Sequence, residues 1–288
     1  MHAARELVES CQTLLSLPEI YLRIRKVVED RHSSMDDLAK ALALDPSMTA
    51  RVLQIVNSPF YSVPRRIDTL SQAVNLLGMR PIQNIVFATS VGKAFPKLPP
   101  TVMDMNAYWT ASVLCALLSI QFARLSRIRD SEPFFIAGLL RDIGHLVLYQ
   151  TAPDRAQSAL VEAQNLNQPL AEVERASIGC DYAEVGAELI NKWGMPPQLE
   201  QVIRYQLSPD QASSEAQRGA AILFAAGTLV DFLGRHGLRK AIPAEIFAAA
   251  LGPLQISQPS AEDALSNALD QLNGTLALIY PAGRSLAA

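Results

Sequence analysis

Two long apolar stretches constrain the fold of this chain most strongly. They run from Tyr108 to Phe122 and from Phe134 to Leu148. Both fall short of the roughly 20 apolar residues that a membrane-spanning helix needs, and both contain polar interruptions. They therefore predict buried helices, with no membrane association. Hydrophobic residues make up 49% of the 288 residues and charged residues 18%, which suits a sizeable core and argues against disorder.

Start and stop signals for helices recur along the chain. Asp45 and Pro46 suit an N-cap and a first helical position, and Ser34 followed by Asp37 suits a capping arrangement. No stretch alternates convincingly over strand length, and no solenoid repeat is visible. The sequence predicts an all-α fold with helices at Glu19–Glu29, Met35–Leu44, Ser47–Val56, Leu70–Leu77, Pro81–Ala94, Asp104–Leu125, Glu132–Tyr149, Asp154–Asn165, Pro169–Ser177, Asp181–Trp193, Pro197–Tyr205, Ser214–Leu233 and Ala261–Leu276.

The segment Lys97–Pro100 is the clearest internal linker, because it ends in two consecutive prolines. It predicts a hinge between an N-terminal helical lobe, residues 1–98, and a second helical lobe, residues 101–235. The remaining residues, 236–288, are predicted to form a helical tail that packs on the second lobe.

Charge and cysteine content limit the function classes. The formal net charge is −3, so bulk charge does not suggest nucleic acid as the partner, although a local basic patch stays open. Cys11, Cys115 and Cys180 lie far apart without metal-binding spacing, which favours a reducing compartment. The first residues carry charges and no long apolar run, so no signal peptide is expected and the predicted location is the cytoplasm.

Segments in the second lobe resemble a known superfamily. Gly138–Leu148, which contains Arg141-Asp142, closely resembles the metal-binding segment of the HD-domain phosphohydrolases. Gly179–Leu189 and Trp193–Pro196 resemble a second stretch of the same superfamily, in the same order.

Segments in the first lobe narrow the resemblance. Leu17-Pro18, Asp45–Tyr61 and Ala73–Gly78 resemble the N-terminal lobe of the HDOD family, whose name stands for HD-related output domain. The chain thus resembles a degenerate branch of the HD superfamily, and the resemblance implies a two-lobed helical bundle with an HD-like core.

The ligand positions of the parent superfamily are mostly lost. An HD hydrolase holds divalent metals with imidazoles and carboxylates, and the metal activates bound water. Arg141 stands where the superfamily has a histidine, and a guanidinium is a permanent cation. Only Asp142 keeps a ligand side chain among the degenerate positions, which are Ala111, Arg141, Asp142, Tyr182, Gln206 and Gly227. The resemblance implies no catalytic residue, no metal and no cofactor at this site.

Two readings remain for the former metal site. Arg141 and Asp142 either form an internal ion pair, which we favour, or contact an anionic ligand or partner. Tyr182, Tyr205 and Gln206 either fill the volume that the metals vacated or line a small pocket. His145 stands where the parent motif has lysine. It either titrates near neutral pH or, as we favour, is a satisfied or solvent-facing helical histidine.

A loop in the first lobe is a second candidate site. Phe60 and Tyr61 lead into Arg65 and Arg66, residue types that are enriched at interface hot spots. The alternative is a turn in which the Phe60 side chain packs into the hydrophobic core. The preceding segment, Met35–Val56, has the outline of a helix-turn-helix. Its second helix is too apolar to contact base edges in a DNA groove, so we expect this helix to pack inside the lobe.

The resemblance implies a non-catalytic output module of bacterial signal transduction, of the kind found in response regulators. Its lobes would hinge about the linker and contact a signalling protein whose identity the sequence does not give. Two alternatives stay open: a divergent metal-dependent phosphohydrolase acting on nucleotides or cyclic dinucleotides, and a DNA-binding regulator. DNA is the less favoured partner, and the sequence does not predict the oligomeric state.

Overall fold

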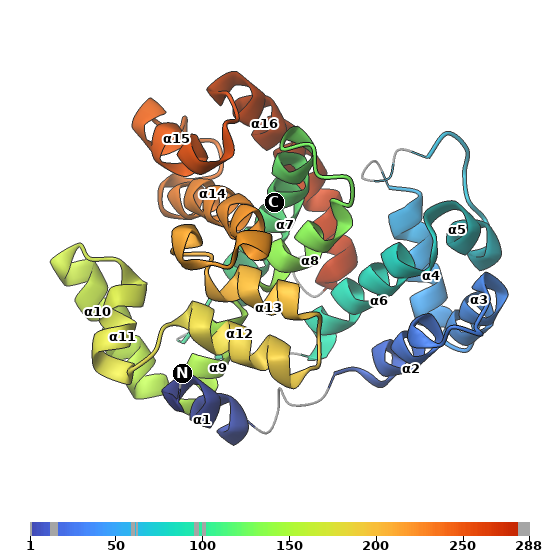
Figure 1. The fold of residues 1–288 in the computed structure, drawn as a ribbon, viewed down its shortest axis with the longest axis horizontal. Helices are drawn as coiled ribbons and strands as arrows, with labels where there is room; N and C mark the ends of the chain where they lie inside the picture. The colour runs from blue at the N-terminus through green and yellow to red at the C-terminus, as the bar shows by residue number, and fades with distance from the viewer. Residues whose placement is uncertain are drawn as a thin grey trace. The chain divides into compact units, whose positions relative to one another are not determined.

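The computed structural model describes residues 2–11, 17–58, 61, 63–94, 98–99 and 102–281, and every regular element within these ranges is helical. The predicted all-α class is therefore confirmed. The chain divides into two compact units (Figure 1). Unit 1 comprises Met1–Ser16 and Lys97–Ala268, and unit 2 comprises Leu17–Pro96 and Leu269–Ala288.

This division differs from the three predicted segments, 1–98, 101–235 and 236–288, at both ends of the chain. Helix α1 (His2–Ser10), which the sequence did not predict, belongs to unit 1. Helix α16 (Gln258–Ile279) begins in unit 1 and ends in unit 2. Lys97 and Pro100 of the linker lie outside the described residues, so the hinge stays a prediction.

Unit 1 is built around helix α7 (Met105–Leu125), which is buried along most of its length and packs against α8 (Glu132–Leu140) and α14 (Ser214–His236). The hairpin of α10 and α11 lies at the edge of the unit, beside α9 (Figure 1). The other helices of the unit are α9 (Ile143–Thr151), α10 (Pro153–Leu166), α11 (Leu170–Ile178), α12 (Tyr182–Lys192), α13 (Pro197–Arg204) and α15 (Ala244–Leu251).

Two helix crossings in unit 1 depend on glycine. A Cβ on Gly138 would lie 2.5 Å from the Cα atom of Ala116, so α8 and α7 meet backbone to backbone. A Cβ on Gly144 would lie 1.9 Å from the carbonyl oxygen of Tyr182, so α9 meets the start of α12 equally closely. These crossings bring the segment between α8 and α9 against α12.

The predicted helix Glu132–Tyr149 is wrong in one respect, because it is two helices. α8 ends at Leu140 and α9 begins at Ile143, with Arg141 and Asp142 in the turn between them. The His145 amide donates to the Asp142 carbonyl at 3.1 Å, a tighter pattern than the i to i−4 ladder. Apolar periodicity could not reveal the break, since both helices are buried almost all round.

Unit 2 contains the helices whose ends the sequence placed best. Asp45 accepts from the Met48 amide at 3.0 Å, and Ser34 and Asp37 form a reciprocal capping box. α6 starts two residues earlier than the predicted Pro81. The helices are α2 (Glu19–Glu29), α3 (Met35–Ala43), α4 (Pro46–Val56), α5 (Leu70–Leu77) and α6 (Met79–Ala94).

Two helices, α7 and α14, are long and apolar enough to cross a membrane by length and composition alone. In their most apolar windows 72% and 67% of the residues, respectively, are buried inside the fold. Burial of this extent is what core helices of a soluble protein show, as the sequence predicted for the Tyr108–Phe122 stretch.

Candidate functional site

The site is centred on Arg141, in the turn between α8 and α9. Its side chain is 5% exposed, and each guanidinium nitrogen faces an oxygen. Nη2 donates to Asp231 Oδ2 at 2.7 Å, Nη1 donates to the Gly227 carbonyl at 3.5 Å, and Nε lies 3.4 Å from Asp142 Oδ1. The predicted Arg141–Asp142 ion pair is present, but the shorter contact is to Asp231.

The charge of Arg141 is fixed by its surroundings. Burial alone would lower the pKa of this guanidinium, but the carboxylates of Asp142 and Asp231 outweigh it and hold the pKa well above the ordinary value. The pKa of Asp142 is raised, chiefly by burial, and the nearby guanidinium opposes that rise. Arg141 is therefore a permanent cation between two carboxyl groups.

The neighbouring helices are shaped to hold this side chain. A Cβ on Gly227 of α14 would lie 2.8 Å from Arg141 Nε and 2.9 Å from Cζ, so only glycine leaves room for the guanidinium. The side-chain amide of Gln206, just after α13, donates to the Arg141 carbonyl at 2.9 Å and is itself buried. Tyr205, next to it, is half-buried and forms the C-cap of α13.

A second buried cluster adjoins the first. Glu174 of α11 is 2% exposed, and its Oε2 accepts from the Tyr182 amide at 3.0 Å at the first turn of α12. Its Oε1 lies 3.4 Å from Nδ1 of His145, whose ring stacks on Tyr182 with the centroids 4.1 Å apart. His145 is therefore a satisfied, mostly buried histidine.

The electrostatics of this cluster follow from burial and from Glu174. Burial would lower the pKa of His145, but the Glu174 carboxylate raises it by more, so the net shift is upward. Burial raises the pKa of the Tyr182 phenol far above its ordinary range, although the charge of Arg141 opposes that rise. The Tyr182 hydroxyl is thus neutral at any physiological pH.

Helix α7 supplies the remaining wall. Burial raises the pKa of the Cys115 thiol to about 12, with Arg141 opposing, and burial likewise raises the pKa of Tyr108. Ala111 is half-buried and lies one turn from both, at helical spacings of three and four residues. The predicted degenerate positions Arg141, Asp142, Tyr182, Gln206 and Gly227 therefore gather at one place, and Ala111 lies on the helix that walls it.

These residues do not fit a divalent metal of the HD type. No group of three His, Cys, Asp or Glu side chains with metal-binding geometry occurs in the part of the chain that the structure describes. Asp142 and Asp231 offer oxygens, but the Arg141 guanidinium stands between them and would repel a second cation. Tyr182 and Gly227 offer no imidazole or carboxylate where the superfamily has ligands.

Asp231 and Glu174 are not among the candidate residues that the sequence predicted. Asp231 follows Gly227 by one helical turn on α14, so the two face the same side. Apart from Glu215 in the first turn, it is the helix's only acidic residue, and it interrupts an apolar run. That isolated acid was the available signal. Glu174 carried no comparable signal, since α11 is short and has acidic and basic neighbours.

The second candidate site, in unit 2, is a loop between α4 and α5. The Asn57 side chain closes it by donating to the Ile67 carbonyl at 2.7 Å and accepting from the Ile67 amide at 2.8 Å. Arg65 and Arg66 are exposed, and Arg66 pairs with Asp68 at 3.1 Å.

The aromatic part of this loop is only partly placed. Tyr61 is half-buried, whereas Phe60 lies outside the described residues. The structure therefore brings Tyr61, Arg65 and Arg66 into one closed loop, and the role of Phe60 stays a prediction.

The helix-turn-helix outline corresponds to α3 and α4. Met48, Val52 and Val56 of α4 are buried, and Arg51 donates to the Thr89 carbonyl of α6 at 3.3 Å. This contact favours the packing role predicted for α4.

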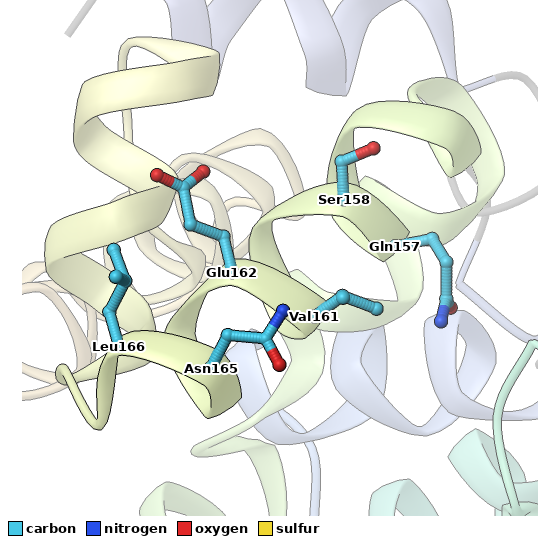
Figure 2. Close-up of a pocket in the computed structure, with 6 residues that line it drawn as sticks. All are labelled: Gln157, Ser158, Val161, Glu162, Asn165 and Leu166. Carbon is cyan, nitrogen blue, oxygen red and sulfur yellow. The ribbon is translucent and has the colours of Figure 1, made fainter.

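An open groove lies elsewhere in unit 1. It encloses about 470 Å³ along the outer side of α10, and Figure 2 shows that the lining side chains all come from that helix. Glu162 is its only titratable side chain, so the groove lacks the paired groups that acid–base or metal chemistry needs.

Comparisons with known proteins agree with this geometry. The sequence model of the HDOD domain family matches residues 14–209. A curated protein of Treponema pallidum (strain Nichols), described as uncharacterized, is 22% identical over 244 residues, or 83% of this chain. That alignment covers 46% of the relative, so the chain spans about half the length of the curated protein it matches.

Two solved structures have a similar fold. A candidate phosphohydrolase from Shewanella amazonensis SB2B gives a TM-score of 0.75 at 22% identity, covering 99% of this chain and 98% of its own. A candidate signal transduction protein from Marinobacter aquaeolei VT8 gives 0.68 at 22% identity, covering 92% and 59%. The TM-scores show that the fold is shared.

Proposed function

Because the chain belongs to the HDOD domain family, we propose that it is a non-catalytic regulatory module of bacterial signal transduction, cytoplasmic, and acting through contact with a partner protein. One observation carries the proposal: a buried guanidinium, that of Arg141, occupies the centre of the former metal site and pairs with Asp231 and Asp142. Hydrolysis in the parent superfamily requires a metal that activates water there. A permanent cation at that place fills the room for a metal and engages the oxygens that would face it.

The loop between α4 and α5 is the contact surface that we propose. Arg65 and Arg66 are exposed on a loop that the Asn57 side chain holds closed through the Ile67 backbone, so the backbone that carries them is held in place. A fixed backbone lowers the ordering cost of binding, and arginine is enriched at interface hot spots. A signalling protein with an acidic surface is the partner that two exposed arginines suit.

The contact surface is tested by capturing partners from the native cell on immobilised protein. We expect the double variant Arg65→Ala/Arg66→Ala to lose the captured protein, whereas Arg31→Ala retains it. Arg31 is a matched control, because it is also exposed and also lies in a turn of unit 2. Equal capture by the two variants would refute this surface.

The rival proposal is a divergent metal-dependent phosphohydrolase. The Shewanella structure described above is named as a candidate phosphohydrolase. It is tested by measuring the metal content of the purified chain and its turnover of cyclic dinucleotides and a chromogenic phosphodiester in Mn²⁺. We expect neither stoichiometric metal nor turnover above that of an Asp142→Asn variant. Turnover that this variant abolishes would overturn the non-catalytic proposal.

A further inference from the structure

The oxygens around Arg141 resemble the ligand set of a hard cation. They are carboxylate oxygens of Asp142 and Asp231 and the carbonyl oxygen of Gly227, at 3.4, 2.7 and 3.5 Å from three different guanidinium nitrogens. Carboxylate and carbonyl oxygens are the ligands that Mg²⁺, Ca²⁺ and Mn²⁺ prefer. The guanidinium donates hydrogen bonds to the Asp231 and Gly227 oxygens and lies within ion-pair distance of Asp142 Oδ1.

These oxygens come from two parts of unit 1 that Arg141 joins. Asp142 precedes α9, whereas Gly227 and Asp231 lie one turn apart on α14. Without a cation between them, the mostly buried Asp142 carboxylate would face the half-exposed Asp231 carboxylate, which costs free energy. Arg141 therefore both neutralises and connects them.

Gly227 shows that this arrangement is a fitted pair and not a chance contact. Any side chain there would begin with a Cβ within 2.9 Å of the guanidinium. Glycine in the interior of a long helix is otherwise unfavourable by about 1 kcal/mol relative to alanine. Gly227 thus accommodates Arg141 while it lowers the intrinsic stability of α14.

We infer that Arg141 is a built-in cation that takes the structural place of a divalent metal, and that Asp142, Asp231 and the Gly227 carbonyl form a latent hard-cation site beneath it. The inference goes beyond the proposed function, since it concerns what joins α9 to α14 and holds whether or not a partner binds. The site uses Asp231, which is not among the ligand positions that the family resemblance pointed to.

The test removes the guanidinium and asks whether a metal replaces it. The variant Arg141→Ala is titrated with Mn²⁺ and with Ca²⁺, and its midpoint of thermal unfolding and its metal binding by calorimetry are measured. For 10 mM metal and a Kd on the order of 0.1 mM, the midpoint should rise by roughly 5 to 10 °C, whereas the wild-type midpoint should not move. The double variant Arg141→Ala/Asp231→Asn should lose the response.

A second variant keeps the inference testable if Arg141→Ala does not fold. Arg141→Lys retains a cation, so it should fold and be indifferent to Mn²⁺, and Arg141→Gln should fold less stably and respond to Mn²⁺. The inference is overturned if the neutral variants match the wild type in stability, if a folded neutral variant gains no stability from Mn²⁺ or Ca²⁺, or if all variants and the wild type respond equally to metal. A wild-type protein that hydrolysed phosphodiesters would defeat the proposed function without producing any of these results.

Discussion

Replacing Gly227 with alanine tests whether the guanidinium of Arg141 is held as tightly as the structure indicates, and Gly234 provides the matched control. Both glycines lie on α14, seven residues apart. A Cβ on Gly234 would meet nothing within 4 Å, whereas a Cβ on Gly227 would lie 2.8 Å from Arg141 Nε. The same substitution on the same helix therefore probes helix propensity alone at one position, and propensity plus a collision at the other.

The two substitutions should change the unfolding free energy in opposite directions. At Gly234, alanine should stabilise by about 0.5–1 kcal/mol, because it lowers the entropy cost of the helix. At Gly227 the guanidinium must move by roughly 0.7 Å, since non-bonded heavy atoms are best separated by about 3.5 Å or more. That shift strains the contact with Asp231 and overpacks the site, costing about 2–3 kcal/mol. After the helix gain, Gly227→Ala should destabilise by about 1–2 kcal/mol.

The assay is urea unfolding followed by tryptophan fluorescence. The chain has two tryptophans, Trp109 and Trp193, and both lie in unit 1, so the signal reports the unit that contains α14. The midpoints are compared at a common slope, because a change in slope would mark a change in the unfolding reaction itself. We expect the Gly227→Ala midpoint to fall and the Gly234→Ala midpoint to rise.

The Arg141→Ala background supplies the refuting result. Once the guanidinium is gone, Gly227→Ala has nothing to collide with, so its effect should reverse and become stabilising, as at Gly234. This reversal is a coupling free energy of about 2–3 kcal/mol between two residues in contact. If Gly227→Ala has the same effect in both backgrounds, the close fit between Arg141 and Gly227 does not exist.

Three further predictions concern the same unit. Asp231→Asn should lower the unfolding free energy by about 1–2 kcal/mol, as measured by fluorescence-detected unfolding. This is less than the 3–5 kcal/mol expected for breaking a fully buried ion pair, because the Asp231 side chain is 47% exposed. The folded-state pKa of His145 is raised by Glu174 above its ordinary 6.5, so its stabilisation is complete below pH 6.5 and lost as pH rises through the raised value. His145→Asn should therefore flatten the fall in unfolding free energy above pH 6.5, seen by comparing both proteins at pH 6 and pH 8. With the pKa of Cys115 raised to about 12, its thiolate fraction at pH 8 is on the order of 10⁻⁴, so mass spectrometry should find Cys115 unmodified by iodoacetamide until urea unfolds the chain.

Helix ends were predictable where the signal is local. The caps at Ser34, Asp45 and Asp181 act over three residues, and in the structure each side chain accepts from the amide three residues on. The break between α8 and α9 was not predictable in this way. The break is fixed by tertiary contacts: Gly144 packs against the carbonyl of Tyr182, and Arg141 donates a hydrogen bond to Asp231 of α14. Periodicity carries no information about such contacts when both helices are apolar all round.

Only part of the candidate site could be predicted from the sequence, for a similar reason. Family resemblance pointed to positions, and the structure brings most of them together, but it could not tell which residue balances a buried arginine. That balance is set by the whole fold: Asp231 lies 90 residues from Arg141 in sequence. Electrostatics requires an acidic partner for a buried guanidinium but does not identify it, and the isolated acid in the apolar run of α14 was the only local signal that the sequence of that helix carried.

The same reasoning separates the loss of a metal site from its replacement. If ligands had simply been lost, the vacated volume would be filled by uncharged side chains, as Tyr182 and Gln206 do here. Instead a carboxylate is retained at Asp142, another stands at Asp231, and a cation lies between them. Apolar side chains of similar volume are often as stable as a buried ion pair, so filling the site does not require this arrangement. What it adds is a charge-specific link between α9 and α14, which a metal would also have provided and which Arg141 supplies without any dependence on metal supply.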